Sequence, residues 1–399
     1  MALTWKRASL AFVVLMGIVS LFSDMTYEGA RSITGQFLAL LGASGATIGF
    51  ISGFGEFIGY AIRLVSGYIG DRTKRYWTII FFGYAVNLIS VPLLALTKHW
   101  KTAALLIFTE RLGKAIRTPI RDAMLSNATQ EIGHGWGFGL HEFLDQLGAL
   151  LGPLAVSLVL YFKYKYRICF LFLFIPAISA LSALTLLRLQ YPNPRELEKT
   201  STELEIKGFS RTFWFYLFAV ALIAISYIDF PLIAYHLDRI NIASREQIPI
   251  FYAAAMGVSS VSALSFGYLF DRIGFFTTII GFLMPIPFAP LIFLGNFYSA
   301  LIGVVIWGIG IGAQESIMRA TVAKMSPIYK RGSAYGIFHA WYGLFWFLGS
   351  TLMGVLYDTS TFILTTLSVL IQLTSIFVLA FIFYVTQKTK NNRVQSFQV

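Results

Sequence analysis

The sequence predicts an all-α membrane protein with twelve transmembrane helices in two six-helix bundles. Apolar residues make up 57% of the 399 residues and charged residues only 13%, whereas soluble domains carry about 25% charged residues. The mean hydropathy is +0.70. Mainly apolar stretches follow one another along the chain, each long enough to cross a bilayer, which takes about 20 residues. The solvent of most of this chain is therefore lipid.

The apolar stretches fall into two sets of six. The first set covers residues 8–41, 45–70, 76–97, 102–125, 135–162 and 168–188. The second set covers residues 211–237, 246–270, 275–297, 299–324, 332–357 and 361–386. Between them, residues 189–210 are polar and contain two prolines and mixed charges, which is typical of a solvated linker. The predicted domains are an N-terminal bundle at 1–188, a cytoplasmic linker at 189–210 and a C-terminal bundle at 211–399.

The basic residues predict the orientation of the chain. The net charge is +12, but Lys and Arg lie in short clusters between apolar runs and form no patch that would bind nucleic acid. Most of them fall in the loops on the side of the N-terminus. The other side holds only Lys98, Lys101, Lys163, Lys165, Arg167, Arg239 and Arg245. By the positive-inside rule, both termini are expected in the cytoplasm, in a multi-pass protein of the cell (inner) membrane.

The two halves resemble each other in sequence. GWGFGLHEF, which begins at Gly135, is similar to GSAYGIFHAW, which begins at Gly332, and GYIGDR at 67–72 is similar to GYLFDR at 267–272. Each pair opens or follows the corresponding helix of its set. Two related six-helix repeats joined by one polar linker are the layout of many secondary transporters, with the substrate site between the repeats.

The loop after the second predicted helix resembles a signature of the major facilitator superfamily. The matching positions, with their repeat after the eighth helix, are Gly67, Asp71, Arg72, Gly267, Asp271 and Arg272. Lys74 stands where the family's second glycine is usual. The resemblance implies the twelve-helix fold of that family, transport by alternating access rather than enzymatic activity, and a loop that locks one conformation.

The fifth predicted helix resembles the drug:proton antiporter branch. Its glycines and proline keep the spacing of that signature at Gly139, Gly148, Gly152 and Pro153. The closing glycine pair of the signature is replaced by Val156 and Ser157, and on the fourth helix only Arg111 matches the branch. The resemblance implies proton-coupled export. The alternative is a stripe of small residues that only packs helices closely.

Ionisable side chains are crowded into the predicted helices of the first bundle. Each costs about 2.5–3.5 kcal/mol at the bilayer centre on insertion scales, so each needs a partner or a function. The candidates for proton coupling are Asp24, Glu28, Glu56, Glu110, Glu142 and Asp145. The candidates for substrate binding are Tyr27, Arg31, Arg111, His141, Asp229, Glu315, Arg319, His339 and Trp341.

Structural pairing is the alternative for several of these charges. Glu28 with Arg31, and Glu56 with Arg63, lie at spacings that allow pairs within one helix. Arg121 with Asp122 suits a pair near the cytoplasmic end. Asp24 and Asp145 favour function, because neither has a basic neighbour one turn away on its own helix.

The expected function is proton-coupled efflux of a small organic or amphipathic molecule. Two alternatives stay open: uptake of a small anionic nutrient by symport, or transport of a metal or metal chelate. A membrane enzyme is not expected, since no nucleophile elbow or phosphate loop occurs in the sequence.

Neither a resident metal nor a cofactor is expected, because His141, Glu142 and Asp145 have no cysteine or second histidine nearby. The single Cys169 predicts a small buried side chain. The expected partners are the substrate, protons and lipid, and by the family resemblance a monomer suffices.

Overall fold

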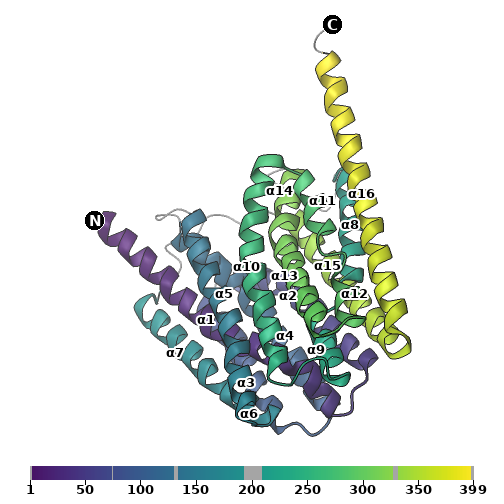
Figure 1. The fold of residues 1–399 in the computed structure, drawn as a ribbon. Coiled ribbons are helices and arrows are strands. Elements are labelled where there is room, and N and C mark those ends of the chain that lie inside the picture. Colours follow the sequence, from purple (N-terminus) through teal and green to yellow (C-terminus); the bar gives the residue numbers. More distant parts are fainter. Residues whose placement is uncertain (1, 74, 130–133, 193–208, 327–330, 397–399) are drawn as a thin grey trace. The chain divides into compact units, whose positions relative to one another are not determined.

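The computed structural model describes residues 2–73, 75–129, 134–192, 209–326 and 331–396, and within these ranges it contains helices and no strand. At 2–6, 64, 67–72, 127, 134–136, 323, 331–333 and 386–396 only the backbone is described. All twelve predicted spans fall on described helices, so the all-α prediction is confirmed (Figure 1).

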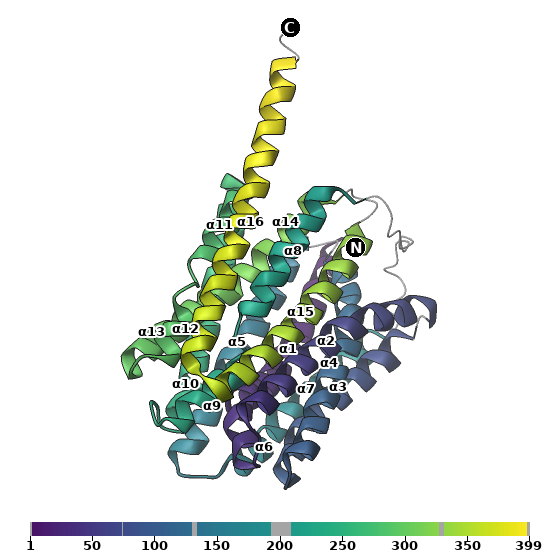
Figure 2. The same ribbon diagram turned by 90° about the vertical axis from the view of Figure 1, so that its right-hand side faces the viewer.

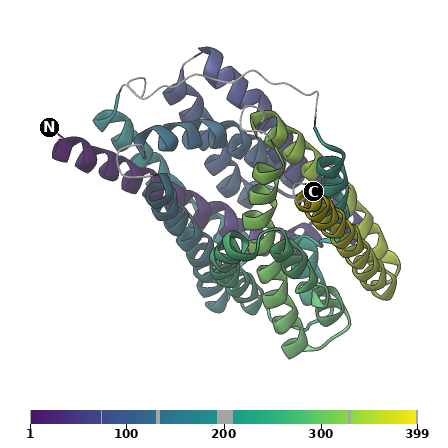
Figure 3. The same ribbon diagram turned by 90° about the horizontal axis from the view of Figure 1, so that it is seen from above.

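The helices form two compact units. The first unit holds residues up to Ser201 together with Asp229–Met256. Its helices are α1 (Ala2–Leu40), α2 (Gly45–Thr73), α3 (Tyr76–Leu93), the 3₁₀ turn η1 (Leu94–Leu96), α4 (Trp100–Ala128), α5 (His134–Tyr161), α6 (Tyr166–Phe172), α7 (Phe174–Gln190), α9 (Phe230–Arg239) and the start of α10 (Gln247–Ile273). Within this unit α1 packs against α5, α7 and α9 (Figure 3).

The second unit holds Thr202–Ile228 and Gly257–Val399. Its helices are α8 (Arg211–Ser226), the rest of α10, α11 (Phe276–Leu283), α12 (Phe288–Phe293), α13 (Phe297–Ala313), the π-helical turn η3 (Gln314–Met318), α14 (Arg319–Met325), α15 (Arg331–Thr359) and α16 (Thr361–Ser396). α8 packs against both α15 and α16 (Figure 2). The predicted division at a 189–210 linker stays a prediction, because residues 193–208 lie outside the described ranges.

Eleven helical stretches of the described chain are long and apolar enough to cross a membrane. α4 is absent from this group because it carries six charged residues between Glu110 and Asp122. It lies against α2 and α3, and its side chains of Glu110, Arg111 and Arg117 are buried within the unit. A helix that is too polar for lipid alone can still cross a membrane when its charges face the interior of a bundle.

The predicted span 211–237 is broken in the structure. α8 ends at Ser226, and Asp229 caps the N-terminus of α9. Pro231 explains the break, since in a continuous helix its ring would clash with the carbonyl four residues earlier, at Tyr227. Irregular backbone at membrane depth needs partners, and the carbonyls freed by the break have them. Ser368 Oγ donates to the Ser226 carbonyl at 2.8 Å, and Trp307 Nε1 donates to the Ile228 carbonyl at 2.9 Å.

Proline also decides two other local features. α11 and α12 replace one predicted helix at 275–297, because Pro285 and Pro287 follow the end of α11. In α4, Pro119 lacks the N–H that would bond to the Ala115 carbonyl. Ser66 Oγ of α2 donates to that carbonyl at 2.9 Å, and the hydroxyl thereby joins α2 to α4.

Candidate functional site

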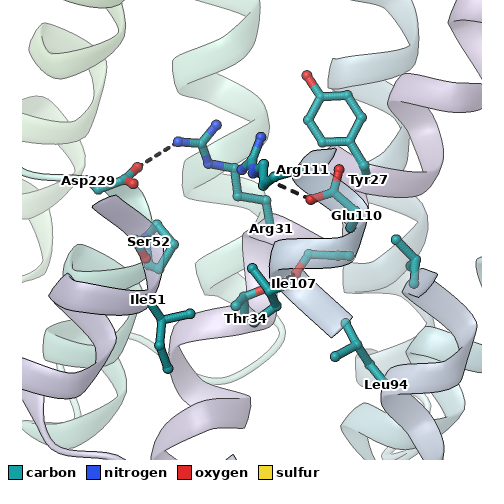
Figure 4. Close-up of a pocket in the computed structure, with 13 residues that line it drawn as sticks. Tyr27, Arg31, Thr34, Ile51, Ser52, Leu94, Ile107, Glu110, Arg111 and Asp229 are labelled. Carbon is teal, nitrogen blue, oxygen red and sulfur yellow. Dashed lines mark hydrogen bonds and ion pairs between the residues drawn. The ribbon is translucent and has the colours of Figure 1, made fainter. Parts of the chain in front are cut away.

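A pocket in the first unit is lined by side chains of α1, α2, α3, α4 and α9 (Figure 4). Four charged groups face it: Arg31, Glu110, Arg111 and Asp229. Tyr27, Thr34, Ser52 and apolar residues complete the lining. Its free volume is about 30 Å³, which suffices for ordered water but not for an organic solute.

Arg31 lies at the centre of the pocket's ion pairs. Its Nη2 is 2.6 Å from Asp229 Oδ1 and 3.1 Å from Glu56 Oε1. The anticipated pair of Arg31 with Glu28 on the same helix is replaced by these two contacts with other helices. Asp229 also accepts a hydrogen bond from the Phe230 N–H at 3.0 Å, so one carboxylate caps α9 and holds Arg31.

The charges continue from Arg31 to α4. Glu56 Oε1 is 3.3 Å from Arg111 Nη2, and Arg111 Nε is 3.4 Å from Glu110 Oε2. Asn87 Nδ2 of α3 donates to Glu110 Oε1 at 2.7 Å. Glu56 therefore pairs with Arg31 and Arg111, and not with Arg63 as the spacing on α2 allowed. Alternating signs offset the cost of burying each charge, which would be large for an isolated ion.

Lys114 of α4 contacts Tyr27 of α1. Its Nζ donates to the Tyr27 hydroxyl and lies 3.6 Å from the centre of that ring. An ammonium group over a tyrosine face gains electrostatic attraction that grows when both groups are shielded from water. Tyr27 thus holds a cation next to the pocket.

A second group of charges lies along the same faces of α1, α4 and α5. Arg117 Nη2 is 3.8 Å from Asp24 Oδ1, and Arg121 Nη1 is 3.8 Å from Asp145 Oδ1. Arg121 also contacts Asp122 at 2.9 Å. The spacing on single helices could not reveal these partners, because the bases that face Asp24 and Asp145 belong to α4. At 3.8 Å neither of these two long ion pairs is a direct hydrogen bond.

The remaining candidates on α5 lie apart from the pocket lining. His141 is buried and its Nε2 is 2.8 Å from Ser20 Oγ. Glu142 is exposed and accepts a hydrogen bond from Gln146 at 3.1 Å. In the part of the chain that the structure describes, no group of three or more His, Cys, Asp or Glu side chains could hold a metal ion.

Glu28 differs from the other buried acids of this unit. Its Oε2 accepts a hydrogen bond from the Tyr252 hydroxyl of α10, and its side chain is buried. Among the described residues no Lys or Arg forms an ion pair with it. A guanidinium partner is present for each of Asp24, Glu56, Glu110, Asp145 and Asp229.

The glycines of α5 pack against α1. A Cβ at Gly148 would lie 2.1 Å from the Leu21 carbonyl oxygen, and one at Gly152 would lie 2.3 Å from that of Met25. Pro153 is buried within the helix, whereas Gly139 has no neighbouring atom within 4 Å of a Cβ. Close packing alone therefore accounts for two of the four positions.

The candidates of the second unit lie on η3, α14 and α15. Glu315 and Arg319 are exposed, and Arg319 Nε donates to the Glu315 carbonyl at 2.7 Å. Trp341 Nε1 donates to the Leu217 carbonyl at 3.0 Å, and His339 is half-buried. Asp229, which the sequence placed in the second bundle, belongs instead to the first compact unit and its pocket.

The structure describes only half of the predicted conformational lock. Gly267, Asp271 and Arg272 lie at the C-terminal end of α10, where Asp271 and Arg272 are exposed. A Cβ at Gly267 would lie 3.2 Å from Ser316 Oγ. The side chains of the equivalent positions near the end of α2 lie outside the described part; these are Gly67, Asp71 and Arg72.

Three contacts of the site had no signal in the sequence. Asn87 and Tyr252 are uncharged residues on apolar helices, and Ser20 is one of many serines. Their roles depend on which carboxylate or imidazole faces them. Lys114, Arg117 and Arg121 could have been found, because each is a charge within the predicted span 102–125.

The sequence of this chain is similar to a known protein family and to several known proteins. A family model described as Major Facilitator Superfamily matches residues 9–350. Uncharacterized proteins of Mycobacterium tuberculosis and Mycobacterium bovis are each 36% identical to the chain over 356 residues, which cover 88% of this chain and 87% of the relative. An uncharacterized MFS-type transporter of Methanocaldococcus jannaschii is 25% identical over 364 residues, covering 87% of this chain and 89% of that protein.

Solved structures share the arrangement of helices at low sequence identity. The nucleoside transporter NupG matches with a TM-score of 0.77 and 13% identity, over 92% of this chain and 99% of that one. A peptide transporter in complex with sulfate matches with a TM-score of 0.78 and 11% identity, over 94% of each chain. At such identities the likeness concerns the fold alone.

Proposed function

This chain belongs to the major facilitator superfamily, and we propose that it is a proton-coupled member that exports a small organic molecule across the cell membrane. The observation that carries the coupling proposal is the environment of Glu28. Its buried carboxylate contacts a hydroxyl, whereas the other buried acids of the first unit contact guanidinium groups.

An ionised carboxylate without a basic partner lacks the ion-pair attraction that compensates the burial of the other acids of this unit. A buried ionised carboxylate is costly in a poorly hydrated interior, and protonation removes that cost. Tyr252 suits both forms of Glu28, since its hydroxyl donates to a carboxylate and accepts from a carboxylic acid. The contact joins α1 to α10. We infer that gain and loss of a proton at Glu28 changes the strength of this contact during the transport cycle.

The export direction rests on the resemblance of α5 to the drug:proton antiporters. Gly148 and Gly152 support this reading less than their spacing implies, because both pack directly against α1. A second candidate is symport of a small anion into the cell. The two guanidinium groups that line the pocket, those of Arg31 and Arg111, favour it because they suit a carboxylate or a phosphate.

Flux measurements with one pair of variants test the coupling. A substrate selected by a ligand-dependent thermal-shift screen is followed in proteoliposomes with and without an imposed pH gradient. Glu28→Gln, which stays neutral, should abolish accumulation driven by the gradient and should retain exchange of labelled for unlabelled substrate. Glu246→Gln is the matched control, since Glu246 lies in the loop before α10 and pairs with Lys163, and it should behave like the wild type.

The alternatives give different results in the same vesicles. Gradient-driven accumulation by Glu28→Gln at the wild-type level would show that Glu28 does not carry the proton. The direction of net movement relative to the pH gradient separates an exporter from a symporter. If the wild-type protein moves substrate at the same rate with and without the pH gradient, proton coupling is refuted.

We propose that both termini lie in the cytoplasm and that the monomer is the working unit. Single cysteines placed at exposed Lys98 and Arg75, in a Cys169→Ser background, report the orientation. A membrane-impermeant maleimide should label the cysteine at 98 in intact cells and the one at 75 only after permeabilisation; the reverse pattern contradicts the proposal. Light scattering in detergent should give a protein mass of 44.6 kDa.

A further inference from the structure

A row of aromatic rings runs along α15 in the second unit. The ring of Tyr335 lies 6.4 Å from that of His339, and His339 lies 5.0 Å from Phe338. Phe338 stacks on Tyr342 at 5.8 Å, and Tyr342 lies 5.3 Å from Trp346. Tyr335 and His339 are half-buried, whereas Trp346 is only 5% exposed. The row therefore leads from a partly accessible end into the interior of the unit.

A π-helical turn meets this row at Tyr342. The turn begins at Gln314, whose Oε1 accepts a hydrogen bond from the Tyr342 hydroxyl at 2.9 Å. The other end of the same amide has no partner: Gln314 Nε2 is buried and bonds to no other atom of the described chain. Single π-helical turns inside α-helices occur frequently at functional sites. Here the turn presents an unused hydrogen-bond donor beside an aromatic ring.

Trp346 presents a second unused donor. Its indole Nε1 is buried without a partner among the described residues. Two other tryptophans of the same unit show the ordinary arrangement, because Trp307 and Trp341 donate to backbone carbonyls at 2.9 and 3.0 Å. Buried donors are nearly always paired in native proteins, so each exception requires an explanation.

We propose that Gln314, Tyr342 and Trp346 form a binding subsite for a planar, uncharged aromatic or heteroaromatic group that carries hydrogen-bond acceptors. The rings supply stacking surfaces, and the two free N–H donors suit a carbonyl oxygen or a ring nitrogen. Neither donor carries a charge, so neither offers an ion pair, and this favours a neutral group over an anion. The inference rests on the proposed transport function and names the chemical class of substrate that this subsite accepts.

Nuclear magnetic resonance of the tryptophan side chains tests the subsite directly. The full chain, labelled with ¹⁵N at the indole nitrogen, is reconstituted in nanodiscs without a pH gradient. The resonance that is lost in Trp346→Phe identifies the Trp346 N–H. Caffeine, a heteroaromatic probe with acceptors and no donors, heads a panel of such compounds, and toluene supplies an aromatic face without an acceptor.

The expected result is specific to this N–H and to acceptors. Caffeine or another acceptor-bearing member of the panel should shift the Trp346 resonance, and toluene should not. Trp346→Phe and Gln314→Leu should each weaken binding of that compound by roughly two- to tenfold, the effect of one lost hydrogen bond. Trp214→Phe and Gln372→Leu are the matched controls, because Trp214 is exposed on α8 and the Gln372 Nε2 donates to Ser368 Oγ at 3.1 Å. Both controls should bind the compound like the wild type.

Several results would overturn the subsite. No shift of the Trp346 resonance by any acceptor-bearing compound up to its solubility limit would do so. An equal shift with toluene would show that acceptors are not recognised, and equal weakening in Trp214→Phe would show a general effect on the fold. Binding in this experiment needs no proton gradient, so its outcome is independent of the flux result for Glu28→Gln.

Discussion

Asp229 has two separable roles, and substitutions can separate them. Its Oδ1 caps the N-terminus of α9 through the Phe230 N–H and also pairs with Arg31 at 2.6 Å. Asparagine caps helices about as well as aspartate, so Asp229→Asn removes the charge and keeps the cap. Asp229→Ala removes both. The two variants should therefore differ by the contribution of the cap alone.

The magnitudes follow from the neighbours of Asp229. Removing one partner of a buried ion pair costs about 3–5 kcal/mol, but Arg31 retains Glu56 at 3.1 Å. We therefore expect Asp229→Asn to destabilise the first unit by about 2 kcal/mol, below that range. Loss of the cap adds about 1 kcal/mol in Asp229→Ala. The wild type should be the most stable of the three proteins, Asp229→Asn less stable, and Asp229→Ala the least stable.

Cys169 provides the assay. It is the single cysteine of the chain, it is fully buried in α6, and it belongs to the same unit as Asp229. A maleimide dye that fluoresces on reaction with a thiol will report its exposure during heating in detergent. Asp122→Asn is the control, since the Asp122 side chain is 47% exposed in its pair with Arg121 and exposed pairs contribute little.

Two results would refute the reasoning about Asp229. If Asp229→Asn unfolds at the wild-type midpoint, the pair with Arg31 contributes no net stability. If the asparagine and alanine variants unfold together, the cap contributes none. A loss in Asp122→Asn as large as that in Asp229→Asn would show that burial of the pair does not determine its contribution.

Three further predictions concern packing and pH. Ser66→Ala should destabilise by about 1 kcal/mol, because it removes the partner of the carbonyl that Pro119 leaves free. In a Pro119→Ala background the N–H of residue 119 can bond to the Ala115 carbonyl, so the loss of stability caused by Ser66→Ala should be smaller there. An equal loss in both backgrounds argues against this reasoning. Gly148→Ala should cost about 1–3 kcal/mol by overpacking against α1. Gly139→Ala should raise the unfolding midpoint slightly, because alanine is favoured over glycine in a helix by about 1 kcal/mol and a Cβ there meets no neighbour; similar losses for both would contradict the packing account. The pKa of Glu246 is held below its ordinary value, first by a hydrogen bond from its own backbone N–H and also by Lys163. A carboxyl group whose folded pKa is lowered stabilises the fold above its unfolded pKa, about 4.3, and this stabilisation is lost as the pH falls through the folded pKa. The unfolding midpoint of Glu246→Gln should therefore fall less with falling pH than that of the wild type. The same dependence of the midpoint on pH in both proteins would contradict this.

Much of the fold is determined by the sequence alone. The positions of the spans follow from hydropathy, because lipid admits only helices whose backbone groups are bonded internally. The break between α8 and α9 has a local cause as well. Pro231 and the capping carboxylate of Asp229 both lie within the predicted span 211–237, although the span was predicted as one helix. Local chemistry of this kind can be read without any knowledge of neighbouring helices.

Only the tertiary structure decided which charges meet. Helical spacing shows neighbours on one helix, so it offered Arg31 as a partner for Glu28. The structure instead pairs Arg31 with Asp229, 198 residues away, and places Tyr252 at Glu28. Coulomb attraction and hydrogen bonding act through space, and the packing of helices sets those distances. The sequence therefore determined that the first bundle is charged, whereas the packing of α1 against α9 and α10 decided which carboxylate lacks a basic partner.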